Sequence, residues 1–121
     1  MPEPSQHIYS LVVKKDCPTC TLIEPAIRQL AESLNESLII YVQDDPLFPE
    51  SIQSKVDDSS LEFSYRNHIE IVPTLIRRTD NSESSRIHGW DKHQWQEFTG
   101  IDDLGSDLVD YKPGCGSKTL D

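Results

Sequence analysis

The sequence predicts an α/β domain in which a four-stranded mixed sheet is flanked by helices on both faces. Two short apolar runs, 8–13 and 38–42, are rich in β-branched residues and are typical of buried strands. An amphipathic helix joins them, and such a strand–helix–strand unit has parallel strands and a right-handed crossover. Residues 74–78 and 85–88 then predict an antiparallel hairpin around the turn residues 80–83, so the sheet is mixed.

The first helix is predicted to begin at Cys17, where the spacing of apolar residues changes from that of a strand to that of a helix. One face of this helix carries apolar residues three or four positions apart: Leu22, Ile23, Ala26, Ile27, Leu30 and Leu34. Pro25 lies within it and is expected to kink its axis. Asn35 is the expected end of the helix.

Two further helices complete the predicted order of elements. Residues 50–68 are polar and predict a helix that Asp57 or Asp58 caps. Asp91 is expected to cap a last helix that continues through Phe98. The order is therefore strand, helix, strand, helix, hairpin, helix.

Length, charge and cysteine count limit the class of protein. The 121 residues predict one domain over 1–104, followed by a C-terminal tail or linker over 105–121 that contains Cys115. A net charge of −10 argues against nucleic acid and anionic membranes as partners. No apolar run approaches the length of a membrane span, and three cysteines do not form a secreted disulfide framework, so we expect a cytoplasmic protein.

The segment Cys17-Pro18-Thr19-Cys20, at the start of the first helix, indicates a reactive site. Cys17 at the N-cap can accept hydrogen bonds from the N–H groups of Thr19 and Cys20, which favours its thiolate. Pro18 suits the first helical position because its missing N–H costs little there. A thiol in such a setting can have a pKa of roughly 3.5–7.5 instead of about 8.5. The arrangement suits dithiol redox chemistry.

Two other functions remain open for this cysteine pair. It can form a structural bridge, or half of a zinc site whose other ligands would be Cys115 and one of His68, His88 or His93. A proline-capped helical pair is a poor zinc site, so we expect redox chemistry and no metal.

The combined motifs resemble the thioredoxin superfamily. The features that match are two cysteines opening a helix (Cys17 and Cys20), a proline five residues after the second (Pro25), the segment Val72-Pro73-Thr74 ahead of the third core strand, and a glycine before the last helix (Gly89). The resemblance covers roughly residues 7–100. It implies a thioredoxin fold and a thiol–disulfide oxidoreductase that needs no bound cofactor.

The resemblance also implies a role for each site residue. Cys17 is the nucleophile that attacks a protein or small-molecule disulfide, and Cys20 resolves the mixed disulfide. A cis peptide bond before Pro73 would leave the backbone of Val72 free to pair with an extended substrate beside Thr74. Electrons would come from a partner reductase or another thiol.

Some residues depart from the family pattern. Asp16 replaces the tryptophan that usually precedes the first cysteine, and Leu11 replaces a buried acid. No double glycine follows Pro73, so glutathione binding is not expected. These departures leave open a second function, that of a non-catalytic interaction module such as the N-terminal domain of a larger redox protein. Cys115 is either an additional redox residue that exchanges with the pair or a free tail cysteine.

Overall fold

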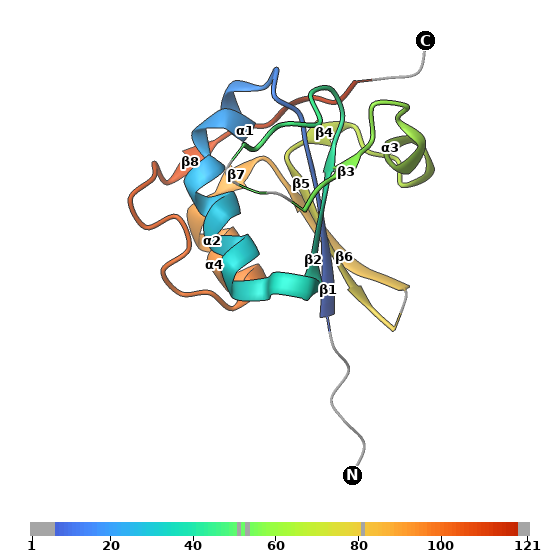
Figure 1. Ribbon diagram of the computed structural model, residues 1–121. Helices are drawn as coiled ribbons and strands as arrows, with labels where there is room; N and C mark the ends of the chain where they lie inside the picture. Colours follow the sequence, from blue (N-terminus) through green and yellow to red (C-terminus); the bar gives the residue numbers. More distant parts are fainter. Residues whose placement is uncertain (1–6, 51, 53, 81, 119–121) are drawn as a thin grey trace.

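A five-stranded mixed sheet forms the centre of the molecule in the computed structural model, which describes residues 7–50, 52, 54–80 and 82–118 (Figure 1). The strand order is β3-β2-β1-β5-β6. The bounds are β1 (His7–Val13), β2 (Leu38–Val42), β3 (Val56–Asp57), β5 (Thr74–Thr79) and β6 (Ser82–His88). β1 is parallel to β2 and antiparallel to β5, and β5 is antiparallel to β6. The predicted mixed sheet is therefore confirmed.

The edges of the sheet extend beyond the predicted strands. The two-residue strand β3 adds a fifth strand parallel to β2, with Tyr41 opposite Val56. β6 begins at Ser82, three residues earlier than the predicted start at 85. Both additions are short and polar, so neither shows the apolar alternation that identifies a strand in a sequence.

Helices cover both faces of the sheet, with α2 (Glu24–Leu34) and α4 (Lys92–Thr99) on one side and α3 (Glu62–Arg66) on the other (Figure 1). Side-chain contacts agree with this placement of the helices on the two faces. The hydroxyl of Tyr9 donates to the carbonyl of Phe98 in α4 at 3.2 Å. The ring of Tyr41 stacks on that of Phe63 in α3, with ring centroids 3.6 Å apart.

The first predicted helix is divided into α1 (Pro18–Leu22) and α2, with the break at Ile23. Pro25 lies in the first turn of α2, where no intrahelical partner is required for its missing N–H. The expected kink is thus a break between two helices. α2 ends at Leu34 with Asn35, the predicted stop, as its C-cap. Asn35 has a positive φ of 49° and begins a 3₁₀ turn, η1 (Asn35–Ser37), that leads into β2.

The helix predicted over 50–68 is shorter than expected, because α3 has only five residues. The N-cap residue is Leu61, so neither predicted aspartate occupies that position, but the Asp58 carboxylate accepts hydrogen bonds from the first-turn N–H groups of Phe63 at 2.9 Å and Ser64 at 3.0 Å. Asp57 instead accepts from the N–H of Ser59.

The last helix begins as the sequence predicts, because the carboxylate of Asp91 accepts a hydrogen bond from the N–H of Gln94 at 3.1 Å. A small sheet precedes it, in which β7 (Trp90–Asp91) pairs with β8 (Tyr111–Lys112). This pairing holds residues from the predicted tail against the body of the domain. None of the helices in the described ranges is long and apolar enough to span a membrane.

Two tryptophans fill the core beneath α4. Trp90 and Trp95 are both fully buried, and their ring centroids lie 5.1 Å apart. The indole N–H of Trp95 donates to the carbonyl of Gly89, and that of Trp90 donates to the carbonyl of Val109. The core around the strands is aliphatic and includes Leu11, Val13, Ile27, Leu30, Ile40, Leu75 and Leu104.

Gly105→Ala is expected to destabilise the fold by about 2–4 kcal/mol, because it combines backbone strain with a steric clash. Gly105 has a φ of +63°, and a Cβ there would lie 2.6 Å from the Trp90 ring. Gly100→Ala is the matched control, since its φ is +76° but no atom lies within 4 Å of a Cβ. Urea unfolding of the two variants measures the difference, and equal losses of stability would contradict the packing argument.

Candidate active site

The loop that carries the first cysteine is fixed by Asp44, at the end of β2. The Asp44 carboxylate accepts hydrogen bonds from the backbone N–H groups of Lys15 at 2.7 Å and Asp16 at 2.9 Å. Burial raises the pKa of Asp44, but the backbone bonds from Asp16 and Lys15 outweigh it and leave the pKa lowered. The Asp44 carboxylate, which follows β2, therefore positions the turn that follows the neighbouring parallel strand β1.

Cys17 lies at the N-cap of α1 with an extended backbone (φ −155°, ψ 108°). The N–H of Cys20 donates to the Cys17 sulfur at 3.2 Å. Hydrogen bonding from the Cys20 side chain is the largest influence and, with smaller bonds from Cys115 and the first-turn backbone, outweighs the opposing effect of burial. Together these effects lower the pKa of Cys17 to about 6. Cys17 is thus the thiol that carries negative charge at neutral pH.

Cys20 is fully buried one turn further along α1. Burial raises the pKa of Cys20, and its hydrogen bond to Cys17 adds to that effect. Leu11, where the family pattern has an acid, is also fully buried. Cys17 is buried as well, so the pair consists of a charged sulfur at the helix start and a protonated sulfur one turn further along, both within the core. No group of histidine, cysteine or carboxylate side chains in the described ranges is arranged to hold a metal ion.

The segment Val72-Pro73-Thr74 lies beside the cysteines, although more than 50 residues of sequence separate them. The Val72–Pro73 peptide bond is cis. The carbonyl oxygen of Val72 lies 3.8 Å from the Cys17 sulfur. The hydroxyl of Thr74 donates to the carbonyl of Ile71, across the bend. A second cis bond, Phe48–Pro49, was not predicted.

The third cysteine joins this site. Strand β9 (Cys115–Gly116) pairs antiparallel with β4 (Ile71–Val72), with Cys115 opposite Val72. The Cys115 and Cys17 sulfurs are 2.6 Å apart. All three cysteines are free thiols. The structure therefore brings together Cys17, Cys20, Val72, Pro73, Thr74 and Cys115, which are all of the site residues that the sequence singled out.

Two expectations do not match this arrangement. Residues 105–121 were expected to form a tail or linker, and the Val72 backbone was expected to be free for a substrate. Residues 111–116 run past α1 to the edge of β4 (Figure 1), and β9 occupies the Val72 backbone. Sequence reasoning also missed two residues that hold this segment. The hydroxyl of Thr19 donates to the carbonyl of Pro113 at 2.6 Å, and buried Gln43 bonds to Ser117 at 2.6 Å. Long-range pairing of this kind leaves no periodic signal in a sequence.

No family model matches the chain, and no curated protein matches it by sequence. Solved structures do match. The germline-specific thioredoxin Deadhead of Drosophila melanogaster has a TM-score of 0.58 and 17% identity, covering 78% of this chain and 79% of its own. Fasciola hepatica thioredoxin has a TM-score of 0.58 and 19% identity, with coverage of 78% and 79%. Thioredoxin f2 of Chlamydomonas reinhardtii has a TM-score of 0.57 and 15% identity, with coverage of 83% and 82%.

The chain has a thioredoxin fold. Within this thioredoxin fold, the two cysteines open the first helix and the Val72–Pro73 segment faces them across the end of the sheet. Asp16 is exposed, and its backbone N–H bonds to Asp44. The elements that the thioredoxin-fold prediction covered lie between the start of β1 and the end of α4, and Cys115 comes from strand β9 further along the chain.

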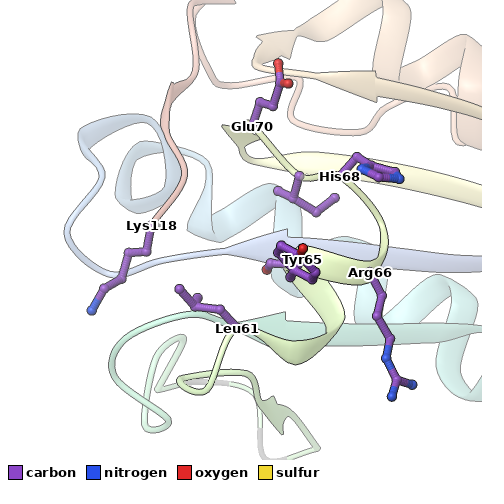
Figure 2. Close-up of a pocket in the computed structure, with 8 residues that line it drawn as sticks. Leu61, Tyr65, Arg66, His68, Glu70 and Lys118 are labelled. Atoms are coloured by element: carbon purple, nitrogen blue, oxygen red, sulfur yellow. The ribbon is translucent and has the colours of Figure 1, made fainter. Parts of the chain in front are cut away.

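A pocket of about 500 Å³ lies between α3 and the C-terminal segment, away from the cysteines. Figure 2 shows its charged residues, among them Arg66, Glu70 and Lys118. The ends of these side chains point outward in different directions and do not converge on one point (Figure 2). They therefore do not form a site for a single charged ligand. Lys118 forms part of the wall, so the C-terminal segment shapes this pocket as well.

Alkylation of Cys17 by iodoacetamide is expected to follow a pH profile with a midpoint near 6, because only the thiolate reacts and the pKa of Cys17 is lowered to about 6. The rate should fall as the pH drops below this value and should be nearly constant from pH 7 to 8. Mass spectrometry of the Cys17 peptide provides the measurement. A midpoint near the ordinary thiol value of about 8.5 would contradict it.

Proposed function

We propose that the protein is a thiol–disulfide oxidoreductase in which Cys17 is the nucleophile and Cys20 the resolving thiol. The observation that carries this proposal is the hydrogen bond from the Cys20 N–H to the Cys17 sulfur at the start of α1. Together with the larger effect of the hydrogen bond from the Cys20 side chain, it stabilises the Cys17 thiolate, while Cys20 stays protonated. The likeness to solved thioredoxins supports the proposal at the level of the fold.

The proposed reaction has two exchange steps. In the first, the Cys17 thiolate attacks one sulfur of a substrate disulfide, and the other substrate sulfur leaves as a thiolate. In the second, Cys20 attacks the Cys17 sulfur of the mixed disulfide. A Cys17–Cys20 disulfide forms, and the remaining substrate sulfur leaves and takes up the proton that Cys20 loses. The substrate is reduced by two electrons, and the protein is oxidised by two.

The environment of Cys20 shapes the second step. Its pKa is raised, so Cys20 must lose its proton as it attacks. Leu11 supplies no carboxylate to accept that proton. We infer that the departing substrate thiolate accepts this proton, which ties proton transfer to the departure of the substrate. No bound cofactor is required, and a thiol or a partner reductase returns the electrons.

The proposed substrates are protein or small-molecule disulfides, and the acidic net charge of −10 disfavours nucleic acid or an anionic membrane as a partner. A cysteine pair that works as a reduced dithiol persists in reducing compartments, so we propose that the protein acts in the cytoplasm. Glutathione is not among the proposed substrates, because no double glycine follows Pro73.

The proposal is tested by the reduction of insulin disulfides with dithiothreitol as electron donor. The wild-type protein is expected to raise the rate well above that of dithiothreitol alone, because the Cys17 thiolate is present at neutral pH. Precipitation of the insulin B chain reports the reaction. A rate equal to that of dithiothreitol alone, also with a small aromatic disulfide as substrate, would rule out the proposed activity.

A second candidate is a non-catalytic interaction module. It is favoured by the pairing of β9 with β4, which occupies the edge where an extended substrate would bind. This candidate predicts no turnover in the insulin assay, together with an ordinary pH profile for the alkylation of Cys17. The lowered pKa of Cys17 favours the oxidoreductase.

A further inference from the structure

We propose that Cys115 is a second resolving thiol for Cys17, and that strand β9 is an internal competitor that expels the substrate from the Val72 edge. This inference rests on the proposed oxidoreductase function and adds a residue and a release step to it. Its basis is that the Cys115 and Cys17 sulfurs are 2.6 Å apart while β9 pairs with Val72.

The position of β9 matches that of an extended peptide bound by strand addition. Cys115 lies directly opposite Val72, and Gly116 lies opposite Ile71. Strand addition provides affinity through backbone hydrogen bonds, whatever the side chains are. An external substrate therefore needs the same backbone groups that β9 already uses. The two cannot pair with Val72 at the same time.

Hydrogen bonds on both sides of Cys115 hold the segment in place. Before it, the Thr19 hydroxyl donates to the carbonyl of Pro113 at 2.6 Å. After it, the N–H of Ser117 donates to the carbonyl of Glu70 at 3.0 Å. Gln43 is fully buried and binds the same stretch twice: its side-chain amide donates to the Ser117 hydroxyl at 2.6 Å and accepts from the Lys118 N–H at 3.1 Å.

Gly114 allows the close approach that places Cys115. A Cβ at this position would lie 2.4 Å from a methyl carbon of Ile71 and 2.8 Å from the Val72 carbonyl oxygen. Gly116 lies on the other side of Cys115, and a Cβ there would meet no atom within 4 Å. The two glycines that flank Cys115 therefore differ: one is required by packing, and the other is not.

Cys115 is also better exposed than Cys20. It is partly buried, whereas Cys20 has no exposed surface. Burial and the hydrogen bond to Cys17 raise the pKa of Cys115, so Cys115 keeps its proton while Cys17 is the thiolate. Of the three sulfurs, Cys17 is thus the first to attack, and two protonated thiols are available to resolve the intermediate.

The proposed step conserves atoms and electrons. A substrate disulfide displaces β9 and forms a mixed disulfide with Cys17, releasing one substrate thiol. When β9 pairs again with Val72, Cys115 attacks the Cys17 sulfur. A Cys17–Cys115 disulfide forms, and the second substrate thiol leaves with the proton of Cys115. Cys20 can then attack Cys17, which forms the Cys17–Cys20 disulfide and returns Cys115 to the thiol.

The test uses one equivalent of dithiobis-nitrobenzoate, an aromatic disulfide that releases a yellow thiolate at each exchange step. Cys20→Ser is expected to release two equivalents of thiolate per protein and to yield a Cys17–Cys115 disulfide in unreduced peptide mapping. The double variant Cys20→Ser/Cys115→Ser is expected to release one equivalent and to keep the nitrobenzoate on Cys17. A single equivalent from Cys20→Ser, with the adduct retained, would overturn the proposal.

A matched pair of glycine variants tests the geometry without removing a sulfur. In the Cys20→Ser background, Gly114→Ala is expected to slow release of the second equivalent at least about tenfold, since it pushes β9 from β4. Gly116→Ala is expected to match its parent. Equal rates for the two variants would contradict the role of β9. Should Gly114→Ala fail to fold by circular dichroism, the Cys115→Ser comparison still decides the proposal.

Failure of the proposed function would be recognised separately. If Cys17 is not a reactive thiolate, the first equivalent is released no faster than from an ordinary thiol. The oxidant diamide takes two electrons when two thiols form a disulfide. It would still yield the Cys17–Cys115 disulfide in that case, because the two sulfurs are close together. If the first equivalent is released fast but the second is not, the proposed oxidoreductase function is supported and the proposed role of Cys115 is wrong.

Discussion

Cys17→Ser is expected to lower the catalysed rate of insulin reduction by on the order of 10³-fold or more, to the level of dithiothreitol alone. Serine keeps the size and position of the side chain but is not ionised at neutral pH, so no nucleophile remains at the start of α1. Neither remaining cysteine can replace it, because the pKa values of Cys20 and Cys115 are both raised. The measurement is the initial rate of B-chain precipitation at pH 7.

Glu32→Gln is the control for this experiment, since Glu32 is an exposed residue of α2 that plays no part in the proposed reaction. It should match the wild-type rate. Cys20→Ser should behave differently from Cys17→Ser, because it retains the thiolate and still forms a mixed disulfide. A Cys17→Ser protein with wild-type turnover would show that a different group performs the exchange.

Trp90→Ala is expected to cost about 3–5 kcal/mol of unfolding free energy, the range for truncating a large buried aromatic side chain. Trp90 is fully buried, packs against Trp95 and donates its indole N–H to the carbonyl of Val109 at 2.8 Å. The substitution removes the ring, leaves a cavity and breaks that hydrogen bond. Because small domains are stable by only about 5–15 kcal/mol, this loss is a large part of the total.

Urea unfolding followed by circular dichroism measures this loss. Trp90→Phe is the graded comparison: it keeps an aromatic ring and loses the hydrogen bond, so it should cost less than the alanine variant. The remaining Trp95 provides a fluorescence signal in both proteins. A loss below about 1 kcal/mol for Trp90→Ala would mean that the indole does not support the core as its burial indicates.

The parts of the fold that the sequence predicted are those with a regular apolar pattern. β1 and β2 are rich in aliphatic residues that are buried or half-buried, and α2 repeats its apolar residues at helical spacing. The candidate site residues Cys17, Cys20 and Pro73 were predicted through their resemblance to a known motif, and the structure places them close together. In each case a few residues close in sequence carry the information.

The missed parts depend on residues far apart in sequence. β3, β7, β8 and β9 are two-residue strands, too short to show any alternation. The glycines around Cys115 suggested a flexible tail, although Gly114 is small because Ile71 and Val72 pack against it. Gln43 gave no signal either, since its partners Ser64 and Ser117 lie 21 and 74 residues away.

The pairing of β7 with β8 sets how far the third thiol can travel. Lys112 is held opposite Trp90, only three residues before Cys115. If β9 detaches while that pairing persists, an extended linker of three residues keeps the Cα of Cys115 within about 10 Å of the Cα of Lys112. Such a short tether corresponds to a millimolar local concentration. A free thiol in solution would therefore need to exceed that concentration before it could intercept a mixed disulfide ahead of the protein's own side chain.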